Sequence, residues 1–106
     1  MQESEWKRFR ELHVVWLNRF CEKVLREISQ IAGDTEITPH ERYRQIYKII
    51  EQQDRSIAYA INDLRRSTAL MQLVAIHSRG LVTDEELSGF TQKTRDIVLS
   101  YPARRD

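Results

Sequence analysis

The long stretch without helix-breaking residues most constrains what this chain can fold into. Between Pro39 and Gly80 the sequence contains neither glycine nor proline, and the whole chain of 106 residues has only 3 Gly and 2 Pro. These two residue types interrupt helices most strongly. We therefore predict one helix over about 39–79, which would be roughly 60 Å long.

The apolar residues of this segment recur with a helical period. Those spaced by seven are Tyr43, Ile50, Ile57, Leu64 and Met71. This spacing is typical of a helix seam buried against a partner helix, as in a coiled coil. Polar Gln53 and Asp54 interrupt the seam, so a kink or break within residues 51–56 is the alternative to a continuous helix.

A first helix is predicted over about residues 5–32. Ser4 is a suitable N-cap, and Gly33 is a natural stop. One face of this helix would carry most of its large apolar side chains together with one histidine: Trp6, Phe9, His13, Leu17, Phe20, Val24, Ile28 and Ile31. The short polar connection that follows predicts that the first two helices are antiparallel neighbours.

Capping signals mark the other two helix starts. Thr38 followed by Pro39 places a cap and a first-turn proline at the start of the long helix. Thr83 and Glu86 have the spacing of a capping box, which predicts a third helix over about 84–100.

Together these elements predict an all-α fold, a three-helix bundle. Its long central helix, about 39–79, would be flanked by the first helix, about 5–32, and the third, about 84–100. We expect one domain over residues 1–106, with a short frayed tail at 102–106.

The charge distribution does not favour nucleic-acid binding. The formal net charge is +1, and no segment forms a polybasic tail. The basic residues Arg44, Lys48, Arg55 and Arg66 share one face of the predicted long helix, but Glu51 lies within that face. This pattern indicates a solvated surface with compensating charges.

Cysteine use and hydropathy indicate a soluble, cytoplasmic protein. The single cysteine, Cys21, has no intramolecular partner and is expected to be a small buried residue. The longest apolar run, Val14 to Leu17, is too short to cross a bilayer, and the first ten residues lack an apolar leader segment. We expect no metal, no cofactor and no membrane contact, because no ligand cluster or phosphate loop is evident.

His13 and Asp54 are the candidate catalytic residues. Antiparallel packing would bring His13, on the apolar face of the first helix, to within about a turn of Asp54. Such a pair could act in acid and base chemistry, or could fix the register of a buried seam. The spacing of Arg8 and His13 is similar to the Arg-x4-His spacing of HEPN-type helical nucleases, but the two side chains would point to different faces of the helix.

A segment of the long helix, residues 69–76, is apolar around most of its circumference. A helix of this kind is buried on all sides. Because the chain supplies cover for only part of it, we predict a homodimer in which a second copy covers the rest. The expected interface residues are Trp16, Leu70, Leu73, Val74 and Ile76.

The function that this build predicts is a small helical protein–protein interaction module or adaptor, acting as a homo-oligomer and possessing no evident catalytic motif. The alternative is a small all-α enzyme or nucleic-acid-processing protein with its site around His13 and Asp54. A polar pocket around His13 would distinguish the enzyme from the adaptor.

Overall fold

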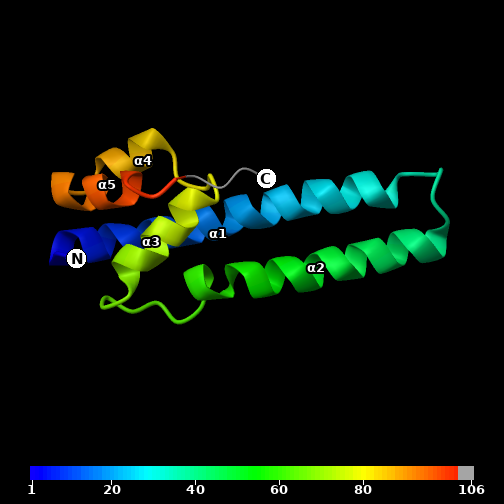
Figure 1. Cartoon of the computed structure of the whole chain (residues 1–106), viewed down its shortest axis with the longest axis horizontal. Coiled ribbons are helices and arrows are strands. Elements are labelled where there is room, and N and C mark those ends of the chain that lie inside the picture. Colours follow the sequence, from blue (N-terminus) through cyan, green and yellow to red (C-terminus); the bar gives the residue numbers. More distant parts are fainter. Residues whose placement is uncertain (103–106) are drawn as a thin grey trace.

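The described part of the chain, residues 1–102 of a computed structural model, is entirely helical apart from its connections (Figure 1), which confirms the predicted fold class. It contains five helices: α1 (Glu3–Ala32), α2 (Pro39–Ile61), α3 (Ala69–Ser78), α4 (Asp84–Ser88) and α5 (Gln92–Leu99). The predicted frayed tail, 102–106, falls almost wholly outside the described residues.

α1 and α2 form a long antiparallel hairpin, as the short connection predicts (Figure 1). Its turn is fixed at both sides. The Thr38 hydroxyl accepts a hydrogen bond from the Glu41 amide at 3.2 Å, and the Arg42 guanidinium donates to the carbonyl oxygen of Ala32 at 2.5 Å. Capping of one helix and closure on the end of the other hold the two helices side by side. α1 begins two residues earlier than Ser4 suggests, because Gln2 is its N-cap.

The predicted long central helix is wrong, because α2 ends at Ile61 and seven residues, 62–68, separate it from α3. The chain instead continues unbroken through Gln53 and Asp54, where the sequence suggested the weakest point. At the break, Asp63 adopts a positive φ of 57°, a left-handed conformation that Asp and Asn tolerate better than most residues.

A buried glutamine stabilises this break. Gln72 is 2% exposed, and its side-chain amide donates to the carbonyl oxygens of Tyr59 at 3.1 Å and Asn62 at 3.3 Å. Its own carbonyl oxygen accepts from the Thr68 hydroxyl at 3.1 Å. Carbonyl groups at a helix C-terminus have no partner within the helix, so Gln72 supplies one from outside.

The third predicted helix is divided into α4 and α5. Thr83 caps α4 as predicted, with its hydroxyl 3.1 Å from the Glu86 amide. A second cap follows at Thr91, whose hydroxyl accepts from the Thr94 amide at 3.3 Å. The backbone amide and hydroxyl of Thr91 also donate to the Glu5 carboxylate, each at 3.2 Å, so α1 holds the start of α5 in place.

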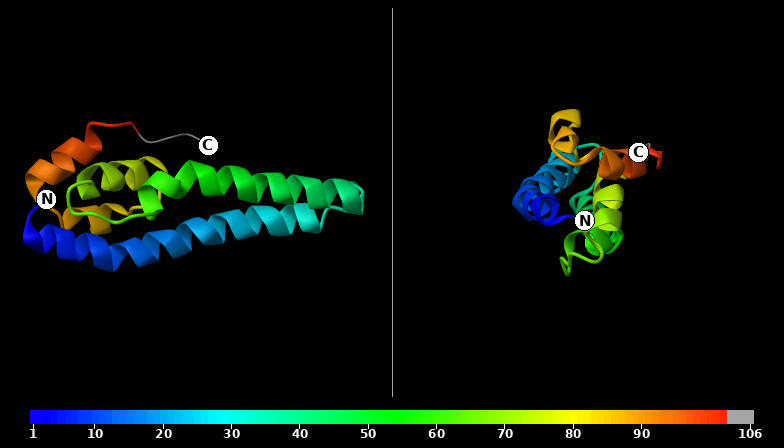
Figure 2. Two further views of the ribbon diagram at one scale, coloured as in Figure 1. Left: turned by 90° about the horizontal axis from the view of Figure 1, so that it is seen from below. Right: turned by 90° about the vertical axis from the view of Figure 1, so that its left-hand side faces the viewer.

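The core lies between the first half of α1, the last turns of α2, and α3, α4 and α5. An aromatic row along α1 forms its centre: Phe9 stacks on Trp6 with ring centroids 6.0 Å apart and meets Trp16 edge-on at 5.8 Å. The views of Figures 1 and 2 show α3, α4 and α5 gathered around the N-terminal half of α1. The half of the hairpin near the 33–38 turn projects beyond this body, and the molecule measures 51 × 24 × 20 Å.

Candidate functional site

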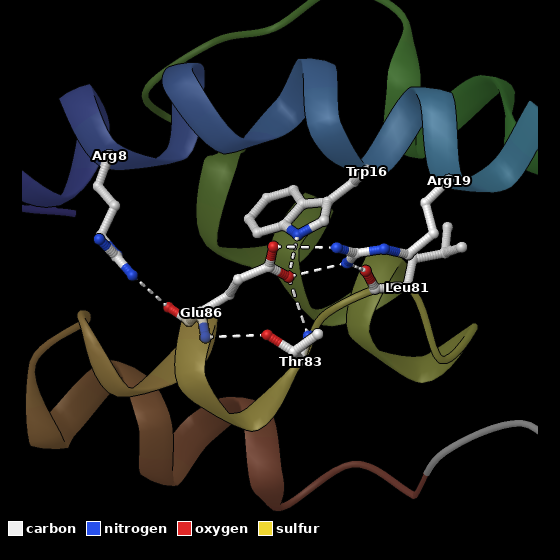
Figure 3. A network of polar contacts seen from close by, with 6 residues as sticks. All are labelled: Arg8, Trp16, Arg19, Leu81, Thr83 and Glu86. Carbon is white, nitrogen blue, oxygen red and sulfur yellow. Dashed lines mark hydrogen bonds and ion pairs between the residues drawn. The ribbon is translucent and has the colours of Figure 1, made fainter.

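A carboxylate from α4 is the centre of the most connected polar cluster, which Figure 3 shows. The Oε1 atom of Glu86 accepts hydrogen bonds from Trp16 Nε1 at 3.0 Å, from Arg19 Nη1 at 2.8 Å and from the Thr83 amide at 3.0 Å. Its Oε2 atom accepts from Arg19 Nη2 at 3.2 Å, and Arg19 also donates to the carbonyl oxygen of Leu81. One side chain therefore caps its own helix and joins α4 to α1.

These donors favour the charged form of the carboxylate. Hydrogen bonding by Arg19 lowers the pKa of Glu86 to about 2 from its ordinary value of 4.5, with further lowering by Thr83 and Trp16. Burial opposes this change, since it raises the pKa of a carboxyl group. A carboxylate held ionised by four donors has no remaining capacity for acid catalysis near neutral pH, so we interpret the cluster as a structural clamp.

Arg8 makes a second connection between the same helices. Its Nη2 atom donates to the backbone carbonyl of Glu86 at 2.9 Å, and its guanidinium lies 5.6 Å from the centre of the Phe90 ring. Gly89 allows this approach, because a Cβ atom there would lie only 2.1 Å from Arg8 Cζ. Arg8 thus faces α4, and His13 faces α2, as expected for side chains on different faces of α1.

His13 is buried, as the sequence predicts, but Asp54 is not its partner. Asp54 is exposed, and the groups that act on the imidazole are the carbonyls of Ala60 and Ile61 at the end of α2. Burial lowers the pKa of His13, while those carbonyls partly oppose the change. The Nε2 atom has no hydrogen-bond partner among the described residues. The pairing failed because α2 ends beside His13 and places Asp54 further along the hairpin.

The residues predicted as the dimer interface are packed inside the chain. Trp16, Leu73, Val74 and Ile76 are 0–6% exposed, and Leu70 is half-buried. The break at 62–68 turns α3 across the N-terminal half of α1, where α5 and the residues around α4 cover it (Figure 2). These side chains therefore form the core, and they are not available to a second copy.

The exposed apolar surface lies instead on α2. Tyr43, Tyr47 and Ile50 are 71%, 63% and 46% exposed. At 100° per residue these three side chains and Asp54 fall within an arc of about 60°, so they share one face. Tyr43 and Ile50 were predicted to belong to the buried seam. The buried side chains of α2, Ile57 and Ala60, point to a neighbouring part of its surface. The other helices pack against α2 on that part only.

α1 extends this surface across the hairpin. Leu25 is 56% exposed, and it lines a hollow of about 280 Å³ together with residues from both helices: Phe20, Cys21, Val24, Ile28, Ile50, Gln53 and Asp54. A second hollow, of about 330 Å³, lies along α2 itself and is lined by Tyr43, Arg44, Tyr47, Lys48 and Glu51. We call the exposed surface from Tyr43 to Asp54, with Leu25 beside it, the hairpin face.

Two features of the hairpin face differ from expectation. Cys21 is exposed, although the sequence suggested a buried residue. The Asp54 carboxylate lies among apolar side chains and makes no hydrogen bond or ion pair with the described residues. Other charges on α2 do have partners, since Arg44 lies 3.9 Å from Glu41 and Arg55 pairs with Glu51.

No cluster of three or more potential metal ligands occurs among residues 1–102. In the same range, no helix is long and apolar enough to cross a membrane. Comparisons of the chain with protein-family models, with curated proteins and with solved structures found no match. The proposed function therefore depends on the surface of this chain alone.

Sequence reasoning identified part of this arrangement. It found Glu86 as a capping residue, but it did not find the bond from Glu86 to Arg19, which is 67 residues away in the chain. It listed Tyr43 and Ile50 as apolar residues at helical spacing and assigned them to the buried seam. The polar side chains Gln53 and Asp54, which interrupt the same seam, could have indicated that this part of the helix surface is exposed.

Proposed function

We propose that this chain is a helical protein–protein interaction module that assembles with a second copy through the hairpin face. The observation that supports this proposal most directly is the exposure of Tyr43, Tyr47 and Ile50 in a row on one helix. A contiguous row of large apolar side chains on a soluble protein is typical of an interaction surface.

The architecture of the hairpin supports the same proposal. Two helices alone cannot cover all of their apolar surface, and the projecting half of the α1–α2 hairpin contacts no other described helix (Figures 1 and 2). Two such hairpins packed face to face would form a four-helix bundle, which is a common way of closing a surface of this kind. Tyrosine is also enriched at protein interfaces, because its ring is apolar and its hydroxyl can remain hydrated.

The proposal is tested by placing a charge on the hairpin face. Tyr47→Glu should convert a dimer to a monomer of 12.7 kDa, measured by light scattering after size exclusion. Tyr59→Glu is the matched control, because Tyr59 is 59% exposed on the same helix but points about 150° away from the hairpin face. Both variants should keep the helical content of the parent chain, measured by circular dichroism.

A parent chain that remains monomeric across micromolar concentrations would refute self-assembly. Equal loss of the dimer in the Tyr47→Glu and Tyr59→Glu variants would refute the hairpin face as the interface. Exposed Cys21 provides an independent measurement, because it lines the hollow next to Ile50. Its alkylation by a thiol reagent should slow as the protein concentration rises through the dimer dissociation constant.

A further inference from the structure

We infer that the two copies pack with their α2 helices antiparallel and centred on Tyr47, so that the hairpin face is complementary to itself. This inference rests on the proposed function, and it adds the orientation and register of the pairing. It follows from the order of apolar and charged side chains along the exposed part of α2. Antiparallel and parallel pairs of α2 bring different side chains opposite each other.

In an antiparallel pair centred on Tyr47, residues whose numbers add to about 94 lie opposite each other. Tyr47 then faces Tyr47 of the other copy, and Tyr43 faces Ile50. These contacts cover the three most exposed apolar side chains of the described part of α2 apart from Tyr59, which points away. The hollow lined by Tyr43, Arg44, Tyr47, Lys48 and Glu51 lies at the centre of the pair and can receive a tyrosine ring.

The same register also pairs charges of opposite sign. Arg44 of one copy comes opposite Glu51 of the other, and two-fold symmetry forms this pair twice. The Asp54 carboxylate comes opposite His40, in the first turn of the other α2, where helix amides and the helix dipole favour a negative charge. Asp54 thereby gains the favourable surroundings that it lacks within its own chain.

A parallel pairing gives the opposite result. Asp54, which lies in the arc of Tyr43, Tyr47 and Ile50, would come opposite Asp54 of the other copy. Arg44 and Glu51 point about 70–90° to one side of that arc, and a two-fold axis parallel to the helices would place their copies on the opposite side of the pair, so neither Arg44–Glu51 pair would form. Like charges across an interface oppose association and act against the wrong orientation. The charge pattern therefore favours the antiparallel pair.

Single cysteines in a Cys21→Ser background test the orientation by oxidation to disulfide-linked dimers. A disulfide needs Cα atoms within about 7 Å. In the antiparallel pair, Tyr47→Cys should link to itself. Tyr43→Cys should not, because two copies of residue 43 are offset by about 12 Å along the helix axis. A mixture of Tyr43→Cys and Ile50→Cys chains should form mixed dimers, since that offset is only about 1.5 Å.

Charge reversal gives a second measurement that does not remove an apolar contact. Arg44→Glu alone and Glu51→Arg alone should each weaken the dimer about three- to tenfold, as expected for two exposed ion pairs. The double variant should restore the parent dissociation constant, because it re-forms both pairs in reverse. All variants are compared at one ionic strength, since exposed pairs are screened by salt.

The outcomes separate this inference from the proposed function. Efficient linkage of Tyr43→Cys to itself, with no rescue in the double charge variant, would refute the antiparallel register while leaving self-assembly intact. Absence of dimers in light scattering and absence of every disulfide would refute both. Self-linkage at position 47, mixed linkage of 43 with 50 and charge rescue together would support the antiparallel pair.

Discussion

Replacement of Glu86 by glutamine should destabilise the fold and remove part of its sensitivity to acid. The carboxylate accepts hydrogen bonds from Trp16, Arg19 and the Thr83 amide, which together lower its pKa from 4.5 to about 2. A difference of this size between folded and unfolded chains corresponds to about 3 kcal/mol at neutral pH. The Arg19 side chain is 34% exposed, so solvent screening reduces the expected loss in Glu86→Gln to about 1–2 kcal/mol.

The direction of the pH effect follows from proton binding. Because the pKa of Glu86 is lower in the folded chain, the folded state binds fewer protons than the unfolded state between pH 4.5 and about 2. The contribution to stability is complete above pH 4.5 and is lost as the pH falls toward 2. The Glu86→Gln variant lacks this pH-dependent contribution. The difference in unfolding free energy between the parent chain and the variant should therefore become smaller as the pH falls over this range.

Urea unfolding followed by circular dichroism at several pH values between about 7 and about 2.5 measures this difference. Glu85→Gln is the control, because it removes the same charge from the same turn of α4 and its side chain makes no hydrogen bond to another described residue. Equal stability of Glu86→Gln and Glu85→Gln at neutral pH would refute the role of the clamp. A difference that is independent of pH would refute its electrostatic origin.

Three further predictions concern the core and the hairpin. Ile57→Ala should cost about 2–5 kcal/mol in urea unfolding, because Ile57 is 4% exposed in the α1–α2 seam, and a loss below about half a kilocalorie would contradict this packing. Gly89→Ala should lower the melting temperature, since the new methyl group displaces the Arg8 guanidinium from its carbonyl and ring contacts, while Gly89→Ala in an Arg8→Ala background should cost less. Below pH 6.5 the parent chain should lose stability as the pH falls, because the buried His13 has a lowered pKa and resists protonation in the folded state. His13→Leu should remove that decline in urea midpoints measured from about pH 7.5 to about pH 5.5, and an unchanged decline would assign it to another group.

The break between α2 and α3 shows where sequence reasoning stopped working. Apolar residues at intervals of seven continue in the sequence from Ile57 through Leu64 to Met71. Residues 62–68, between α2 and α3, are not helical. The interval of seven therefore continues in the sequence, but the regular helical rotation per residue does not continue through this segment. Met71 is consequently 42% exposed, while Leu73 is fully buried. The assignment of faces was wrong beyond the break for this one reason, and the predicted dimer interface was wrong with it.

The sequence by itself determined the helical class and the local signals that start and end helices. Thr38 and Thr83 cap helices as predicted, and α1 ends at Ala32 before Gly33, because these effects involve groups only a few residues apart. Tertiary structure alone decided where the long segment breaks, which face of α2 is covered and what binds Glu86. Those outcomes depend on groups distant in the chain, such as Gln72 at the end of α2 and Arg19 beside α4, and their partners are set by how the helices pack.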